Sequence, residues 1–342
     1  MGSFDQKQDR LRRKQDPLRK EQMKATVVIP NYNGIRYLAD CLDTLSTQST
    51  EDYSVLVVDN GSTDGSFELV ADYPQVRTIR FEENRGFCEA VNAGIKVAES
   101  EYVILLNNDT QVKPDFVEKL IRAIEQDPKI FSVSAKMLSM TQPDKMDDAG
   151  DLYCALGWAY ARGKGRPAEE YSVPCKIFFA CAGAAIYRKK VFEEIGYFDP
   201  MHFAYLEDLD IGYRARIYGY TNRYEPEAEV LHAGSGSSGS RYNEFKVSHS
   251  SANSIYVIAK NMPLLQILIN LPFLLAGFVI KILFFICKGL GITYIKGLGR
   301  GIAMSVSQEG RKKKVRFRMK HFGNYVLIQL QLWWNIVLRL LG

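Results

Sequence analysis

Short apolar runs and longer helical segments alternate regularly between residues 25 and 136. Strand-like runs rich in Val, Ile and Leu occupy residues 25–30, 54–59, 76–81, 102–106 and 130–136. Segments with helical periodicity lie between them, at 35–48, 65–73, 87–99 and 114–126. This alternation is typical of βαβ units, in which helices connect parallel strands and cover both faces of the sheet. The sequence therefore predicts an α/β fold with a mainly parallel sheet.

The composition suits one large domain with a smaller appendage. The chain has 342 residues, of which 46% are hydrophobic and 12% aromatic, enough for a substantial core. Its six cysteines are scattered and include no CxxC pair, which argues against a metal cluster or a disulfide framework and favours a reducing cytoplasm. The first two dozen residues are polar and charged and lack the apolar stretch of a signal peptide. We therefore expect the protein to begin on the cytoplasmic side.

Changes in sequence character divide the chain into three parts. Residues 1–24 form a polar, basic tail, and residues 25–255 are expected to form the α/β domain. Within that domain the periodicity fades between about residues 138 and 176, which indicates an insertion, and "FFACAGAAIYRKKVFEEIG" then predicts a strand followed by a helix. Residues 256–342 become very apolar and then basic, which predicts helices associated with a membrane.

Polar side chains follow each of the first four predicted strands. They are Asn31 and Asn33, then Asp59, Asn60 and Asp64, then Asn84 and Arg85, and finally Asn107, Asn108 and Asp109. Any one of these groups is explained by a turn, because Asn and Asp bond their own backbone. The carboxyl ends of parallel strands, however, meet at one edge of the sheet, where ligands bind. Four successive strands with this property predict a binding site.

The residue types at this edge suit a nucleoside diphosphate and its divalent cation. Mg²⁺ or Mn²⁺ takes a few oxygen ligands from protein and keeps the other positions for phosphate and water. Asp109 supplies the one strong negative ligand in its turn. Asp59 can accept hydrogen bonds from a base or ribose, and Arg85 can neutralise a diphosphate.

A second group of acidic residues lies in "FAYLEDLDIGYRARIYG", residues 203–219. Apolar residues recur here at helical spacing and predict an amphipathic helix: Leu206, Leu209, Tyr213 and Ile217. Glu207 and Asp208 fall in its first turn, where the helix dipole keeps carboxylates ionised. One interpretation is structural, with acids at a helix start and a surface pair between Asp210 and Arg214. The other is a general base that takes a proton from an acceptor hydroxyl.

His232 ends a short strand-like run and precedes a Gly/Ser loop. A neutral imidazole at this place can complete a metal shell, although a histidine on its own is more often structural. Residues 234–239 match G-x-G-x-x-G, but no βαβ unit opens there, so a dinucleotide site is not predicted. A mobile lid is the preferred interpretation of this loop.

Five motifs, in this order, resemble those of the inverting family 2 glycosyltransferases, which have the Rossmann-like GT-A fold. They are "VVIPNYNG", "VVDNGSTDGS", "NRGFCEAVNAGIKVA", "LLNNDT" and "YLEDLDIGYRAR". The resemblance extends over about residues 25–245. Three segments are similar in sequence to the bacterial rhamnosyltransferase-like branch of this family: "LLNNDT", "CAGAAIYRKKVFEEIGYFDPMHFAYLEDLD" and the later H-x-G-S.

The resemblance implies roles for individual residues. Asp109 and His232 become ligands of Mg²⁺ or Mn²⁺, and Asp208 becomes the catalytic base. Asn107 stands at the first D-x-D position, so one negative charge is missing and the preferred metal stays open. The implied nucleotide-sugar site, with Asp59 on the nucleobase, comprises Pro30, Asn31, Asn33, Asp59, Asn84, Arg85, Gly86, Asn107 and Asn108. The implied acceptor side comprises Glu207, Asp210 and Arg214.

The implied activity is metal-dependent, inverting transfer of a sugar. The preferred version moves L-rhamnose from dTDP-rhamnose to a hydroxyl of a lipid-linked glycan in cell-surface polysaccharide synthesis. A UDP-hexose or UDP-N-acetylhexosamine is the alternative donor. The alternative from another functional class is a membrane-bound scaffold that has lost catalytic activity. A processive synthase is not expected, because no Q-x-x-R-W follows the acidic motif.

The apolar segment 263–287 is long enough to span a bilayer. Its polar and small residues, however, share one helical stripe: Gln266, Asn270, Gly277, Lys281 and Lys288. A single crossing would also place the later basic residues outside, against the positive-inside tendency. A buried core helix, or a true span with a distorted return, remains the alternative.

The last segment, 324–342, repeats the pattern. Its polar stripe comprises Asn324, Gln331, Asn335 and Arg339, and Trp333 and Trp334 suit a headgroup layer. We therefore predict peripheral, monotopic or re-entrant attachment to the cytoplasmic face of the cell membrane, with the basic run 311–320 on anionic lipid. A nucleic-acid partner is not expected, because this run lacks interleaved base-stacking aromatics.

Overall fold

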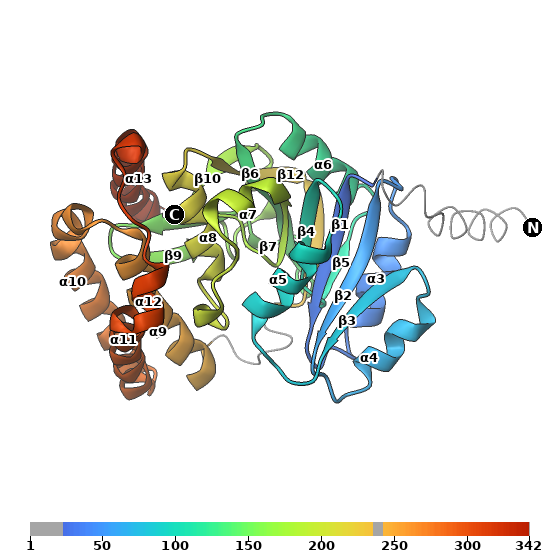
Figure 1. Ribbon diagram of the computed structural model, residues 1–342, viewed down its shortest axis with the longest axis horizontal. Coiled ribbons are helices and arrows are strands. Elements are labelled where there is room, and N and C mark those ends of the chain that lie inside the picture. Colours follow the sequence, from blue (N-terminus) through green and yellow to red (C-terminus); the bar gives the residue numbers. More distant parts are fainter. Residues whose placement is uncertain (1–22, 235–241, 342) are drawn as a thin grey trace, which may run out of the picture.

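The computed structural model describes residues 23–234 and 242–341, which fold around one large, twisted sheet (Figure 1). The first four strands form its parallel half. β1 (Ala25–Asn31) lies between β2 (Tyr53–Asn60) and β4 (Tyr102–Leu106), and β3 (Val76–Phe81) lies outside β2. These bounds agree with the predicted strands to within one residue at either end. The predicted α/β class is confirmed.

The other half of the sheet is mixed. β11 (Ala184–Arg188) runs antiparallel between β4 and β6 (Ile130–Ser139), and β12 (Thr221–His232) is parallel to β6. The short strands β5 (Thr110–Val112) and β10 (Cys175–Ile177) add antiparallel edges to β12. A parallel connection needs a crossover, usually a helix. The segment between β6 and β11 supplies no such helix, so β11 returns antiparallel.

Helices cover both faces of the sheet. They are α3 (Leu38–Ser46), α4 (Ser66–Leu69), α5 (Phe87–Val97), α6 (Phe116–Glu125) and α7 (Lys189–Ile195). Val27 and Ile29 of β1 share a core cluster with α3 and α6, whereas Val28 packs with α5 and α7 on the opposite face. Gly94 lets α5 approach the sheet, because a Cβ there would lie 2.3 Å from Val28. Burial on both faces explains why these strands are continuously apolar in sequence.

The predicted insertion contains short strands between the sheet and the C-terminal helices. They are β7 (Met146–Asp148), which pairs with β6, and the hairpin of β8 (Asp151–Cys154) with β9 (Trp158–Ala161). Strands of three or four residues are too short to give a periodic pattern, so the sequence analysis found no elements here.

The predicted helix at 203–219 is α8 (Glu207–Ile217), and it is buried on almost every side rather than amphipathic. Asp210 and Arg214 form the expected i,i+4 ion pair, at 2.7 Å. Both side chains, however, are buried inside the protein, so the interpretation of this pair as a surface pair is wrong. Neighbouring elements cover α8 on almost every side, so its polar side chains are buried as well. The helix therefore lacks the exposed polar face that the amphipathic interpretation requires.

The C-terminal helices gather at one end of the molecule (Figure 1). They are α9 (Glu244–Asn261), α10 (Leu264–Cys287), α11 (Gly291–Val306), α12 (Gln308–Lys313) and α13 (Phe322–Leu341). Among the described residues, α10 is the one helix long and apolar enough to cross a membrane. Only 17% of its apolar window is buried, so α10 is not a buried core helix.

Gln266, Asn270 and Gly277 of the predicted polar stripe are buried and face the protein, whereas Lys288 lies beyond the end of α10 and is exposed. Tyr213 donates a hydrogen bond to Gln266 at 2.8 Å, and the indole N–H of Trp158 donates to the carbonyl of Gly277 at 3.1 Å. Asn270 donates to Gln329 of α13 at 2.8 Å. The opposite face of α10 leaves large apolar side chains exposed, among them Leu265, Leu268, Leu275, Val279, Leu283 and Ile286.

The polar stripe of α13 is turned inward in the same way. Asn324 donates to the carbonyl of Ile217 of α8, and Asn335 donates to that of Tyr153 of β8, both at 2.8 Å. The other face of α13 exposes Leu327, Leu330, Trp334, Leu340 and Leu341. Both helices therefore bind the domain through their polar stripes and present their apolar sides outward.

A buried ion cluster joins α8, α9 and α12. Nζ of Lys260, on α9, lies 2.7 Å from Asp199 and 2.9 Å from Asp210. Lys313, on α12, contacts the other oxygen of Asp199 at 2.7 Å. Although burial opposes ionisation, Arg214 and Lys260 hold the pKa of Asp210 well below its usual range. The C-terminal helices are therefore joined to the α/β domain by buried charges as well as by apolar packing.

Replacing Lys260 with Met is expected to lower the free energy of unfolding by about 3 kcal/mol. The buried carboxylates of Asp199 and Asp210 then lose the cation that they share. Each keeps a second cation, so the expected loss of stability lies at the low end of the range for a broken buried ion pair. Chemical denaturation of the full chain measures it. The control is Arg122→Met, which breaks an exposed pair with Glu227 and should cost at most about 1 kcal/mol. Equal losses in both variants contradict this account.

Candidate active site

One cleft of about 1000 Å³ opens at the carboxyl ends of β1 and β4. Asn31 comes from β1, Asp109 follows β4, and His232 ends β12. Asp208 reaches the same cleft from the first turn of α8. The β7–β9 insertion and the start of α9 complete the wall. Segments from across residues 30–250 therefore converge on this cleft.

The turns after β1, β2 and β4 meet in a buried hydrogen-bond network. The amide of Asn31 donates to Asp59 at 3.0 Å and to Ser66 at 2.9 Å. Its oxygen accepts from Asn108 at 2.7 Å. Asp59 also accepts from the backbone N–H of Ser62 at 3.1 Å. The amides and the carboxylate that the sequence analysis singled out thus fix the shape of the cleft floor together.

The turn after β3 joins this floor through Asn60. Its amide donates to Asn84 at 3.0 Å, and its oxygen accepts the backbone N–H of Arg85 at 2.9 Å. The guanidinium of Arg85 lies over the ring of Phe81, 4.9 Å from the ring centroid, and is exposed. Its side chain is not part of the cleft wall.

The structure brings most, but not all, of the predicted site residues to the cleft. Those that line it are Pro30, Asn31, Asn84, Gly86, Asn107, Asn108, Asp109, Glu207, Asp208 and His232. Those that do not are Asn33, Asp59, Arg85, Asp210 and Arg214. Asp59 is fully buried beneath the floor, and Asp210 and Arg214 belong to the ion cluster behind α8. The predicted lid falls mostly on residues 235–241, outside the described residues.

Asp109 and His232 meet because β5 pairs with β12. This pairing sets Thr110 opposite His232, and it brings Nε2 of His232 to 3.3 Å from a carboxylate oxygen of Asp109. Nδ1 of His232 lies 2.8 Å from Asp147, which in turn binds Lys164 at 2.6 Å. Although burial opposes protonation, the carboxylates of Asp109 and Asp147 raise the pKa of His232 to about 9.

A strained turn presents Asp208 to the cleft. Phe203, Tyr205 and Leu206 have positive φ angles of 57°, 72° and 64°, which residues with a side chain rarely adopt. The side-chain amide of Asn253, on α9, donates to carbonyl oxygens in this turn, those of His202 (2.9 Å), Ala204 (3.0 Å) and Tyr205 (2.7 Å). The C-terminal helices thus hold the turn that precedes the acidic motif.

The two acids of this motif differ in their surroundings. Asp208 accepts the backbone N–H of Leu209 at 2.8 Å and stays partly accessible from the cleft. Burial raises its pKa from the ordinary 3.8 to about 6. Glu207 is buried, and one of its carboxylate oxygens has no hydrogen-bond partner among the described residues. Burial, and then the charge of Asp208, raise the pKa of Glu207 as well.

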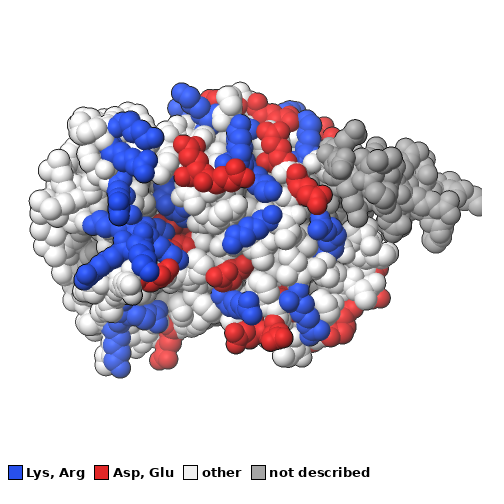
Figure 2. Space-filling model, viewed as in Figure 1, with Lys and Arg blue, Asp and Glu red and all other residues white. Residues whose placement is uncertain are grey.

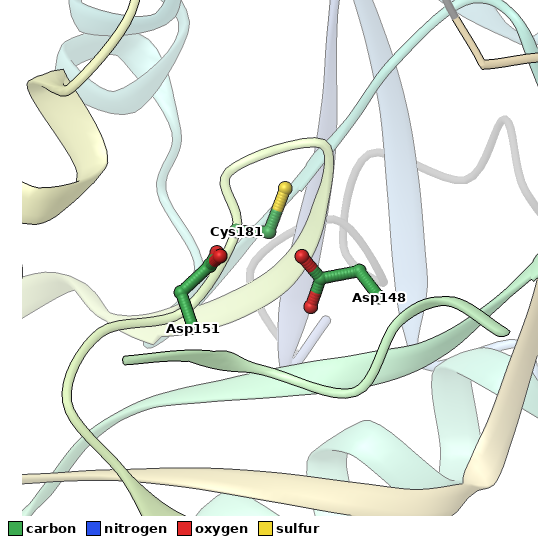
Figure 3. A group of neighbouring side chains, drawn as sticks. All are labelled: Asp148, Asp151 and Cys181. Carbon is green, nitrogen blue, oxygen red and sulfur yellow. The ribbon is translucent and has the colours of Figure 1, made fainter. Parts of the chain in front are cut away.

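Three side chains that were not predicted line the cleft and point toward one another (Figure 3): Asp148, Asp151 and Cys181. Ligand atoms of these three side chains lie within 4.8 Å of one another. Burial raises the pKa of Asp148 to about 7 and that of Asp151 well above its usual range. The run "MDDAGD" was the available signal, but it lay in a segment without periodicity.

Comparison with known proteins identifies the family. The sequence profile named "Glycosyl transferase family 2" matches residues 26–196, half of the chain. This chain belongs to glycosyl transferase family 2. The predicted enzyme class, a glycosyltransferase, is confirmed.

Two relatives are identical to this glycosyltransferase at about a quarter of the aligned positions. The N-acetylglucosaminyl-diphospho-decaprenol L-rhamnosyltransferase of Mycobacterium tuberculosis is 27% identical over 259 residues, 68% of this chain and 83% of that protein. A poly-β-1,6-N-acetyl-D-glucosamine synthase of Staphylococcus epidermidis is 26% identical over 208 residues, 57% of this chain and 48% of that protein.

Solved structures confirm the GT-A fold of the glycosyltransferase. GalNAc-T7 with UDP, GalNAc and Mn²⁺ gives a TM-score of 0.57 at 18% identity, over 70% of this chain and 48% of that chain. The mannosyltransferase of Pyrobaculum calidifontis with GDP-Man and Mn²⁺ gives 0.51 at 16% identity, over 90% and 84%. S. aureus TarS 1–349 with UDP-GlcNAc gives 0.54 at 18% identity, over 85% and 84%.

Asp147→Asn is expected to lower the pKa of His232 from about 9 toward its ordinary value of 6.5, because one of the two adjacent carboxylates is then neutral. NMR titration of the imidazole in metal-free protein measures this pKa. Asp144→Asn, at an exposed carboxylate of the same insertion, serves as the control and should leave the pKa of His232 unchanged. An unchanged pKa in Asp147→Asn would falsify the assigned contact.

Proposed function

We propose that this glycosyltransferase is a metal-dependent, inverting enzyme that transfers L-rhamnose from dTDP-rhamnose to a hydroxyl of a lipid-linked glycan. The observation that carries the proposal is the shared cleft, which has Asp109 and His232 on one wall and Asp208 on another. The name of the M. tuberculosis relative, which covers most of this chain, supports the choice of sugar and of acceptor class.

The donor nucleotide lies on the floor formed by the turns after β1 to β4. Pro30, Asn31, Asn84, Gly86, Asn107 and Asn108 line this floor and are proposed to contact the nucleotide sugar. Asn33, Asp59 and Arg85 complete the proposed set, although their side chains do not line the cleft. Asp59 is hydrogen-bonded to Asn31, so it holds the floor in place beneath the nucleoside.

The residues on the metal wall fit a divalent cation. An oxygen of Asp109 and Nε2 of His232 lie 3.3 Å apart, and Asp147 orients the imidazole through Nδ1, as a carboxylate does behind a metal-bound histidine. Two protein ligands leave room for phosphate and water on Mg²⁺ or Mn²⁺. The group of Asp148, Asp151 and Cys181 is not the proposed metal site, because it lies outside the strand-end turns that form the nucleotide floor.

Asp208 acts as the base. It takes the proton of the acceptor hydroxyl as the hydroxyl oxygen bonds to the anomeric carbon, while the bond from that carbon to the diphosphate breaks. A bound cation supplies positive charge to the departing diphosphate, so no protein acid is needed there. Attack from the side opposite the diphosphate inverts the anomeric centre. The raised pKa of Asp208 makes it a stronger base than an exposed aspartate.

The other acidic-motif residues have supporting roles in this proposal. Glu207 lies beside Asp208 on the acceptor side of the cleft. Asp210 and Arg214 do not reach the cleft, and we propose that they act on the acceptor side only by holding α8 in place.

The outward faces of α10 and α13 attach the enzyme to the cytoplasmic face of the cell membrane. α10 binds the domain along its length, through Gln266 near one end and Gly277 further along, which supports a helix lying in the interface rather than across it. Basic side chains gather over α12 and the segment after it (Figure 2). The exposed ones there, Arg311, Lys312, Lys314, Arg316, Arg318 and Lys320, suit anionic lipid.

A donor screen tests the proposed activity. We expect Mn²⁺- or Mg²⁺-dependent release of dTDP from dTDP-rhamnose in the presence of a polyprenyl-diphosphate-linked N-acetylglucosamine acceptor, with little release from UDP-hexoses or UDP-N-acetylhexosamines. Faster turnover of a UDP-sugar contradicts dTDP-rhamnose as the donor, while the assignment as a glycosyltransferase stands. Failure of every nucleotide sugar to bind or react contradicts the enzymatic proposal as a whole.

Asp208→Asn is expected to reduce transfer by about 10²–10⁴-fold, the usual contribution of a general base, while nucleotide affinity stays within about twofold. Initial rates and nucleotide titrations of the same preparations measure the two quantities. Glu193→Gln, an exposed carboxylate on α7, provides the matched control and should leave both unchanged. Full transfer activity of Asp208→Asn contradicts the assignment of Asp208 as the base and indicates a different base.

A further inference from the structure

One end of the cleft is built from segments that also bind the outward-facing apolar helices. Tyr160 and Ala161 of β9 and Phe245 and Lys246 of α9 line this end. Tyr160 donates a hydrogen bond to the carbonyl of Asn335 of α13 at 2.7 Å. Trp158 at the start of β9 binds α10, as described above. The cleft wall and the apolar helices are therefore one continuous structure at this end.

Aromatic residues at and just before the start of α9 contact the cleft wall on one side and α10 on the other, and together with Phe284 they are called the aromatic row. Phe245 packs edge-on against Phe203 and Tyr205 of the cleft wall, with ring centroids 6.4 Å and 6.1 Å apart. Three residues earlier in the chain, Tyr242 packs against Phe284 of α10 at 5.5 Å. Phe245, Tyr242 and Phe284 are 46%, 38% and 39% exposed, so the row presents accessible apolar surface. It ends at the exposed apolar side of α10.

Positive charge lies where this row enters the cleft. Lys246 follows Phe245 directly, lines the cleft and is half-buried. Burial, and then the charge of Lys164, lower the pKa of Lys246. Both lysines line the cleft, and α9 is an 18-residue helix whose positive end begins here.

The geometry points to a binding site for an isoprenoid diphosphate, with its hydrocarbon along the row of Phe245, Tyr242 and Phe284 and its diphosphate against Lys246. This inference rests on the proposed function, because it assigns the lipid part of the lipid-linked acceptor. An apolar chain gains free energy by covering exposed aromatic surface, and a diphosphate gains it from a fixed cation. The glycan beyond the diphosphate then extends into the cleft that contains Asp208.

The proposed positions of the two diphosphates lie on different elements of the cleft wall. The donor diphosphate belongs to the wall of Asp109 and His232, whereas Lys246 belongs to the wall of α9. Lys164 also lines the cleft, but its Nζ binds Asp147, which contacts His232 on the donor side. Lys246 rather than Lys164 is therefore the residue that distinguishes the two sites.

The test measures binding of farnesyl diphosphate to the full-length protein in detergent, with Mn²⁺ and saturating dTDP occupying the donor site. Lys246→Ala is expected to weaken farnesyl diphosphate about tenfold or more, the effect of one charge-assisted hydrogen bond. Phe245→Ala is expected to weaken it severalfold. Lys190→Ala, at an exposed lysine of α7, is the matched control and should leave the affinity unchanged. Inorganic diphosphate should bind at least about tenfold more weakly than farnesyl diphosphate.

Affinity for dTDP, measured on the same variants, separates the possible failures. The inference predicts that Lys246→Ala leaves dTDP affinity within about twofold of the unchanged protein. Equal weakening of dTDP and farnesyl diphosphate places Lys246 in the donor site and overturns the inference. Absence of farnesyl diphosphate binding while dTDP binds normally overturns it too, with the proposed function intact. Absence of dTDP binding contradicts the proposed function itself, and the inference falls with it.

Discussion

The contact between Asp109 and His232 depends on a short antiparallel pairing, that of β5 with β12. Asp109 and His232 are far apart in the sequence, and this pairing brings them together in the fold. The pairing sets Nε2 of His232 3.3 Å from Asp109 and leaves Nδ1 for Asp147. A carboxylate and an oriented imidazole then face the cleft together, which is the arrangement that the proposed metal site requires.

The opposite wall depends on the C-terminal helices. The turn before α8 contains three residues with positive φ angles, and Asn253 of α9 holds its carbonyl groups. Behind α8, Lys260 of α9 joins Asp199 to Asp210, and Lys313 of α12 extends this cluster toward the basic surface. The helices that are proposed to contact the membrane therefore also hold the acidic motif, so attachment and catalysis involve one connected structure.

Much of the fold could be predicted, because strands buried on both faces are continuously apolar and their polar ends mark the site. The direction of β11 could not, since its apolar pattern is the same in either direction. Helical periodicity found the polar stripes of α10 and α13, but periodicity identifies a face and not what covers it, and both stripes bind the domain. Asp148 and Asp151 were missed because short strands carry no pattern, and the burial of Asp210 arises only from tertiary packing.

The central claim is that the metal lies between Asp109 and His232 and faces Asp208 across one cleft. Anomalous X-ray scattering from crystals grown with Mn²⁺ and a nucleoside diphosphate locates the ion directly. The account predicts one Mn²⁺ peak bonded to Asp109, to Nε2 of His232 and to the diphosphate. A peak held instead by Asp148, Asp151 and Cys181, the other group of metal-ligating side chains in the cleft, would contradict it.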